Sequence, residues 1–133
     1  MTKERLFKRE YARELLNIAN NDLIAAKTLA QNPDVRYETV FFQLQQAVEK
    51  SLKSLLVAQS KSVPIVHDIA LIIDRLVTKP ENADVLCELT DFAAIRRYEE
   101  GTFIVSQEET MAVLTTVEQT LAFCQQQLLM LGL

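Results

Sequence analysis

The residues of this chain best suited to bind a ligand lie in one short polar row. Gln46, Glu49, Lys50 and Lys53 supply an amide, a carboxylate and two ammonium groups within about two turns of a predicted helix. Such a row can hold a polar ligand, or it can be a solvated surface whose charges pair with one another. The spacing is compatible with both interpretations.

Other polar residues could join this row. Asp22 lies among apolar positions of a predicted helix, so we expect it to meet a cation or several donors from another helix, either to fix helix register or to serve a site. His67 is the only histidine, and at a helix start it could cap locally, contact a ligand or accept a proton. Arg97 lies near the end of a predicted helix, where its positive charge could interact favourably with the helix dipole or bind a phosphate through two hydrogen bonds. Tyr98 could stack on a base.

Several classes of active site are not expected. The chain has only two glycines, too few for a glycine-rich phosphate loop. One histidine and two distant cysteines, Cys87 and Cys124, do not make a zinc cluster. The acidic pairs at 99–100 and 108–109 are adjacent and diverge, and no nucleophile-elbow pattern surrounds a serine. We therefore predict no metal site, no cofactor and no catalytic residue of these classes.

Composition predicts one all-α domain over residues 1–133. The chain is 49% hydrophobic and has only three prolines besides the two glycines, which favours an antiparallel bundle of four to five helices. A net charge of −4 argues against general affinity for a nucleic-acid backbone but allows a local basic pocket. Two separated thiols and no signal peptide or membrane-spanning run predict a cytoplasmic protein.

Apolar spacing predicts two long helices in the first half of the chain. The first runs over about 8–30, and the second from 37 to 59 or 60. The expected apolar stripe of the first comprises Tyr11, Leu15, Leu16, Ile18, Ala19, Leu23, Ala25, Ala26 and Leu29. The expected core face of the second comprises Phe41, Leu44, Val48, Leu52 and Leu55, beside the separate polar row.

Three more helices are predicted, over about 69–77, 84–97 and 107–130. Asp68 is a candidate N-cap for the first of these, and Ser106 with Glu109 forms a capping box before the last. The expected core face of the last helix comprises Val113, Val117, Leu121, Cys124, Leu128 and Leu131. Its further apolar residues, Met111, Leu114 and Leu129, exceed what one face needs and predict a homodimer.

The stretch from Phe41 to Leu56 reads FFQLQQAVEKSLKSLL. It resembles the aromatic, then Gln-Ala-x-Glu-Lys-x-x-Lys-x-x-Leu helix of the HEPN domain family, which is named for nucleotide binding in prokaryotes and higher eukaryotes. His67-Asp68, Arg97-Tyr98 and the segment 22–26 are similar to elements that occur in the same order in that family. The resemblance covers about residues 10–130 and implies a small helical bundle.

HEPN families include RNA-cleaving toxins that use an Arg, four to six residues, then a His near the dimer interface. This chain lacks that motif, because no arginine precedes His67 at that spacing. The resemblance thus indicates the branch without the ribonuclease motif and favours a binding protein over an enzyme. Members of that branch are commonly encoded beside a minimal nucleotidyltransferase in toxin–antitoxin-like pairs.

The resemblance implies a homodimer that binds a nucleotide or an RNA element, partners a nucleotidyltransferase, or does both. The expected ligand-binding set is Asp22, Gln46, Glu49, Lys50, Lys53, His67, Arg97 and Tyr98. An alternative is a divergent metal-independent ribonuclease toxin that uses His67 and Arg97. In a third, structural interpretation, the polar row only fixes helix register and dimer geometry.

Overall fold

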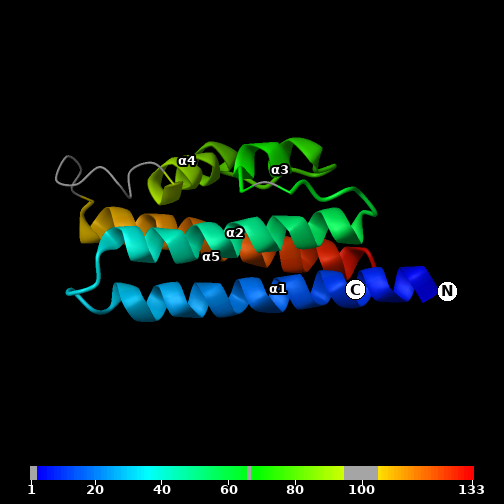
Figure 1. The fold of residues 1–133 in the computed structure, drawn as a ribbon, viewed down its shortest axis with the longest axis horizontal. Helices are drawn as coiled ribbons and strands as arrows, with labels where there is room; N and C mark the ends of the chain where they lie inside the picture. Colours follow the sequence, from blue (N-terminus) through cyan, green and yellow to red (C-terminus); the bar gives the residue numbers. More distant parts are fainter. Residues whose placement is uncertain (1–2, 66, 95–104) are drawn as a thin grey trace.

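The computed structural model describes residues 3–65, 67–94 and 105–133, and the side chains of residues 8–65, 67–89 and 105–133. These residues form five helices and no strand: α1 (Lys3–Ala30), α2 (Tyr37–Ala58), α3 (Ile69–Arg75), α4 (Ala83–Ala94) and α5 (Gln107–Met130). Figure 1 shows α1 antiparallel to both α2 and α5, with α3 and α4 on the side of α2 that faces away from α1. The predicted all-α bundle is confirmed.

Helix α2 is the centre of the bundle, because it contacts each of the other four helices. All five residues of its predicted core face are buried. Burial extends almost around the helix, since alanine and serine fill the remaining inward positions, where neighbouring helices approach closely. Between residues 40 and 57, the partly exposed residues are Phe42, Gln43, Gln46, Lys50 and Lys53. Three residues of the polar row, Gln46, Lys50 and Lys53, are therefore partly exposed, whereas the fourth, Glu49, is buried.

Helix α1 begins at Lys3, five positions before the predicted start, and ends at Ala30 as predicted. Its buried stripe comprises Ala12, Leu16, Ala19, Leu23 and Ala26. The stripe predicted through Tyr11 and Ile18 was wrong at these two positions, which are 54% and 37% exposed. Ala12, Ala19 and Ala26 recur at every seventh position, and their small side chains let α1 approach its neighbours closely. Because successive residues are rotated by about 100° around a helix, the buried side centred on Ala12 is turned by about that angle from Tyr11.

The boundaries of the later helices agree closely with the predictions. Asp68 is the N-cap of α3, since its side chain accepts a hydrogen bond from the Ala70 N–H at 3.0 Å. α3 ends at Arg75, two residues earlier than predicted, because Leu76 turns to an extended conformation. α4 begins one residue early, and positions 95–97 of the predicted helix lie outside the described residues. α5 has the predicted bounds and capping box.

The apolar surface of α5 is smaller than predicted. Leu114 is buried and belongs to the core, whereas Leu131 follows the helix end and is 44% exposed. Met111 and Leu129 remain exposed, as predicted for a surface outside the core. No helix in the described part of the chain is both long and apolar enough to cross a membrane.

Candidate functional site

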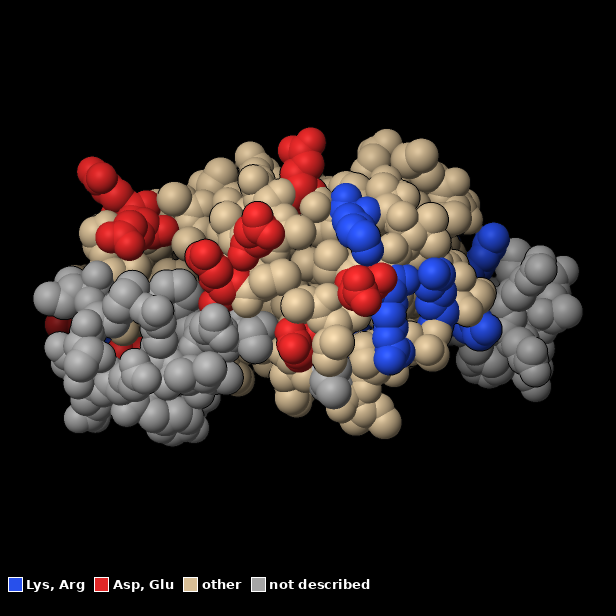
Figure 2. Space-filling view, turned by 90° about the horizontal axis from the view of Figure 1, so that it is seen from above, with Lys and Arg blue, Asp and Glu red and all other residues tan. Residues whose placement is uncertain are grey.

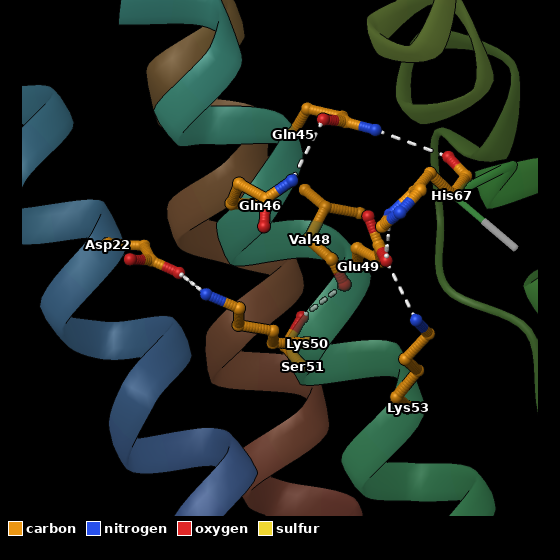
Figure 3. Close-up of polar contacts among 9 residues, drawn as sticks. All are labelled: Asp22, Gln45, Gln46, Val48, Glu49, Lys50, Ser51, Lys53 and His67. Atoms are coloured by element: carbon orange, nitrogen blue, oxygen red, sulfur yellow. Dashed lines mark hydrogen bonds and ion pairs between the residues drawn. The ribbon is translucent and has the colours of Figure 1, made fainter. Parts of the chain in front are cut away.

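A buried carboxylate, Glu49, is the centre of a polar cluster on α2 (Figure 3). Its Oε1 atom lies 2.7 Å from Lys53 Nζ and 2.9 Å from His67 Nδ1. Its Oε2 atom is buried and makes no hydrogen bond with the described residues. Buried polar atoms in folded proteins nearly always have a partner, because an unpaired one loses its hydration without compensation. Glu49 therefore has one acceptor position still to be filled.

Lys53 lies one helical turn after Glu49, which places both side chains on the same side of α2. The Lys53 side chain is 17% exposed and that of Glu49 is 4% exposed, so water screens the pair weakly. The ammonium group balances the carboxylate charge and satisfies Oε1. Its remaining N–H donors are available for a second acceptor.

His67 reaches this cluster from the connection between α2 and α3. The Gln45 side-chain amide donates to the His67 carbonyl at 3.2 Å, which holds the backbone against α2. The next residue, Asp68, caps α3 and so fixes the other side of the connection. The His67 side chain is nevertheless 82% exposed, and its ring contacts Glu49 through Nδ1. The imidazole thus lies over the carboxylate with most of its ring in solvent.

Gln45 is a member of the cluster that sequence analysis missed. It is 4% exposed, and its side-chain oxygen accepts from the Gln46 amide at 3.3 Å. The prediction included Gln46 because that residue falls on the polar row. The sequence does contain a pattern that could have identified Gln45, because it lies one helical turn after Phe41 on the core face of α2. A polar side chain on an apolar face needs hydrogen-bond partners.

Asp22 and Lys50 form a second cluster, between α1 and α2. Asp22 Oδ2 lies 2.7 Å from Lys50 Nζ, and the two side chains are 20% and 29% exposed. The prediction that Asp22 meets a cation from another helix is confirmed. In Figure 3, this pair faces α1 while Glu49 and Lys53 face His67. The expected set is thus divided over two sides of α2, and Arg97 and Tyr98 lie outside the described residues.

Neither cysteine offers a reactive thiolate to the site. Burial raises the pKa of the Cys124 thiol to about 12, and a hydrogen bond with Ser51 opposes this shift only in part. The pKa of Cys87 is also raised, first by burial and then by the negative charges of Asp68 and Asp84. No group of three or more His, Cys, Asp or Glu residues that could hold a metal occurs among the described residues.

The charges on the face seen in Figure 2 are separated along the molecule. Lys and Arg side chains gather toward the end at which α1 begins, and most Asp and Glu side chains lie toward the other end. An anion near the basic end therefore meets a favourable local field in spite of the net charge of −4.

Comparison with known proteins identifies the family of the chain. Searches of curated proteins and of solved structures gave no match. A family model described as the HEPN domain matches residues 12–127, which include all of α2, α3 and α4 and most of α1 and α5. Because this match covers most of the chain, the protein belongs to the HEPN domain family.

Proposed function

We propose that this protein is a HEPN-domain binding module whose ligand is a nucleotide or an RNA element. The observation that carries the proposal is the Glu49 cluster, in which a buried carboxylate with one unfilled acceptor lies beneath an exposed histidine. A buried polar atom without a partner is rare in folded proteins, and a bound ligand is one way to supply that partner.

The cluster has features that a purely structural role does not require. A pair that only fixes helix register is expected to satisfy all its buried polar atoms, yet Glu49 Oε2 has no partner among the described residues. The ring of His67 is 82% exposed and adds little packing. These two observations favour a ligand site over a structural ion pair.

The described residues suggest how the ligand is held. Lys53 has spare N–H donors, and with a hydrogen on Nδ1 the exposed Nε2 of the neutral His67 ring can accept a hydrogen bond from a ligand hydroxyl or amino group. Gln46 is half-buried beside them and supplies a further amide, while Asp22 keeps Lys50 on the neighbouring strip of α2. In this proposal, Arg97 makes a bidentate contact with phosphate and Tyr98 stacks on a base, as their side-chain chemistry allows.

Calorimetric titration of the purified protein with nucleoside monophosphates and a short single-stranded RNA tests this proposal. Lys53→Ala should weaken binding about tenfold or more, because it removes a charged hydrogen-bond donor. Lys27→Ala is the matched control, since Lys27 pairs with Glu118 on an exposed surface away from Glu49. Absence of binding, or equal effects of both substitutions, would reject the proposed site.

The proposal includes a second copy of the chain and a nucleotidyltransferase as partners. The exposed Met111 and Leu129 on α5 support the homodimer, and the family resemblance supports the nucleotidyltransferase. Co-expression with the product of the neighbouring reading frame, followed by copurification, tests the second partnership. A neighbour of another class, or a nucleotidyltransferase that does not copurify, would remove that part of the proposal.

RNA cleavage is the second candidate function, and the Glu49–His67 contact is the observation that favours it. A carboxylate that accepts from Nδ1 orients the ring and leaves Nε2 available as a proton acceptor. In this alternative, His67 acts with Arg97 on a phosphodiester. Incubation of labelled RNA with the protein and with His67→Ala separates the two functions, because a binding module leaves the RNA intact.

A further inference from the structure

We infer that the ligand of the Glu49 cluster is a single strand of several nucleotides, whose backbone phosphates also contact Lys61, Ser62 and Arg75. These three residues are called the Arg75 surface below. The inference rests on the proposed function, because it selects the RNA element over the single nucleotide. It adds a phosphate-binding surface that is separate from both polar clusters on α2.

The first observation is that the two cations of the Arg75 surface have no acidic partner. Lys61 and Arg75 are both exposed, and neither forms an ion pair with a carboxylate of the described residues. The lysines and arginines that do form such pairs are Lys27, Arg36, Lys50 and Lys53. Figure 2 shows basic side chains gathered at the end of the molecule where α1 begins and α2 ends, with one acidic side chain among them. The charges of Lys61 and Arg75 are therefore available to an anion.

The second observation is that the fold brings the donors of this surface together. Arg75, the last residue of α3, donates from Nη1 to the Ser62 hydroxyl at 3.3 Å and to the Ser62 carbonyl oxygen at 3.5 Å. Ser62 follows Lys61 in the connection after α2. Arg75 makes no other hydrogen bond with the described residues, so its Nε and Nη2 can form a two-point contact with a phosphate. The Ser62 hydroxyl accepts from Arg75 and keeps its own hydrogen for a phosphate oxygen.

The third observation is the distance between this surface and the Glu49 cluster. Helix α3 begins two residues after His67, and its seven residues rise by about 10 Å to Arg75. Because Arg75 meets Ser62 just beyond the end of α2, α3 runs from the cluster toward that end, beside the second half of α2 (Figure 1).

This distance is too large for one phosphate. Lys53 is turned back toward Glu49, which lies about 14 Å of helix before the last residue of α2, Ala58. One phosphate group therefore cannot contact both Lys53 and Arg75, whereas successive phosphates of a strand can. Two separated groups of phosphate donors along one side of the molecule are typical of a surface that follows a nucleic-acid backbone.

Binding of uridine nucleotides of increasing length to the full chain tests the inference. The probes are uridine monophosphate, uridine triphosphate and oligouridylates of about two to eight nucleotides, titrated by calorimetry at several salt concentrations. A single base type keeps length as the variable, and the triphosphate adds charge without adding length. We expect affinity to rise about tenfold or more from the monophosphate to the longer oligomers, because each added phosphate contact is a charged hydrogen bond.

Arg75→Gln is the decisive variant, and Arg13→Gln is the matched control. Arg13 is also exposed and forms no ion pair with the described carboxylates, but it lies on α1, on the other side of α2 from α3. Arg75→Gln should weaken binding of the longer oligomers about tenfold and leave that of uridine monophosphate unchanged. It should also reduce the slope of log affinity against log salt by about 0.7, the effect of one phosphate contact on a single strand. Arg13→Gln should change neither quantity.

The possible failures of the inference and of the proposed function differ. Equal affinity for the monophosphate and the longer oligomers, or equal effects of the two substitutions, would overturn the inference and leave the proposed function standing. A triphosphate or a polyglutamate that binds as tightly as the longer oligomers would do the same, because the surface would then respond to charge alone. If Arg75→Gln does not fold, Lys61→Gln at an exposed position provides the same test. Absence of binding by any nucleotide or RNA would overturn both.

Discussion

His67 Nδ1 lies 2.9 Å from Glu49 Oε1, although the His67 side chain is 82% exposed and that of Glu49 is 4% exposed. This contact joins the central helix α2 to the connection that precedes α3. The Glu49 side chain is enclosed by the protein, whereas most of the imidazole ring of His67 is in solvent. The imidazole can therefore leave Oε1 by side-chain rotation, without rearrangement of the helices.

The contact between His67 and Glu49 predicts the tautomer of the His67 ring. An ionised Glu49 accepts hydrogen bonds only, so Nδ1 must carry a hydrogen in the free protein. Nitrogen-15 spectra of the imidazole should show a protonated Nδ1 at pH values where the ring is neutral. Glu49→Met should restore the tautomer with hydrogen on Nε2. A neutral ring with hydrogen on Nε2 alone in the unmodified protein would contradict the contact.

The two lysines of the polar row should differ in their effects on stability. Lys53→Met leaves the buried Glu49 carboxylate with only His67 as donor, and we expect the free energy of unfolding to fall by about 2–4 kcal/mol. Lys50→Met removes a partner from a more exposed carboxylate, Asp22, and should cost about 1 kcal/mol or less. Urea unfolding of both variants measures the difference. Equal losses would mean that Glu49 is not the more strongly desolvated acid.

Cys124 should make stability depend on pH in the alkaline range. Its pKa is raised by burial from 9.0 to about 12, so the folded protein retains a proton that the unfolded chain releases. This contribution is fully present below about pH 9 and is lost as the pH rises toward about 12. Relative to Cys124→Ala, the free energy of unfolding should fall by up to about 1.4 kcal/mol for each pH unit. A pH-independent difference between the two proteins would refute the shift.

The proposed homodimer can be tested through α5. Met111 and Leu129 are 46% and 59% exposed, and a spacing of five helical turns places them on the same side of the helix. If that side is the interface, Leu129→Glu should give a monomer in light scattering, because it buries a charge against an apolar partner. Val77→Glu, at a position that is 69% exposed outside α5, is the control and should leave the mass unchanged. A monomeric unmodified protein would rule out this interface.

Much of the helical framework could be predicted from the sequence, because it depends on local signals. The apolar spacing of α2, the Asp68 cap and the Ser106 capping box each act within a few residues. The position of the α1 stripe could not be predicted in the same way. Tyr11 and Ala12 both begin regular apolar rows, and only the close approach of neighbouring helices selects the alanine row.

The candidate site was predicted in part, for a related reason. Glu49, Lys53 and His67 were expected, but spacing along α2 could not show that the connection before α3 covers Glu49. That covering depends on Gln45, which holds the His67 backbone from a position on the core face. The separation of Asp22 and Lys50 from this cluster likewise depends on which side of α2 faces α1.

The central claim is that the Glu49 cluster binds a nucleotide or an RNA element, and the imidazole spectrum of His67 during a titration with a short single-stranded RNA tests it most directly. We predict that the signal of the Nδ1–H bonded to Glu49 changes in proportion to the bound fraction, because the ligand binds beside His67. Saturable binding of the RNA with an unchanged His67 spectrum would contradict the claim.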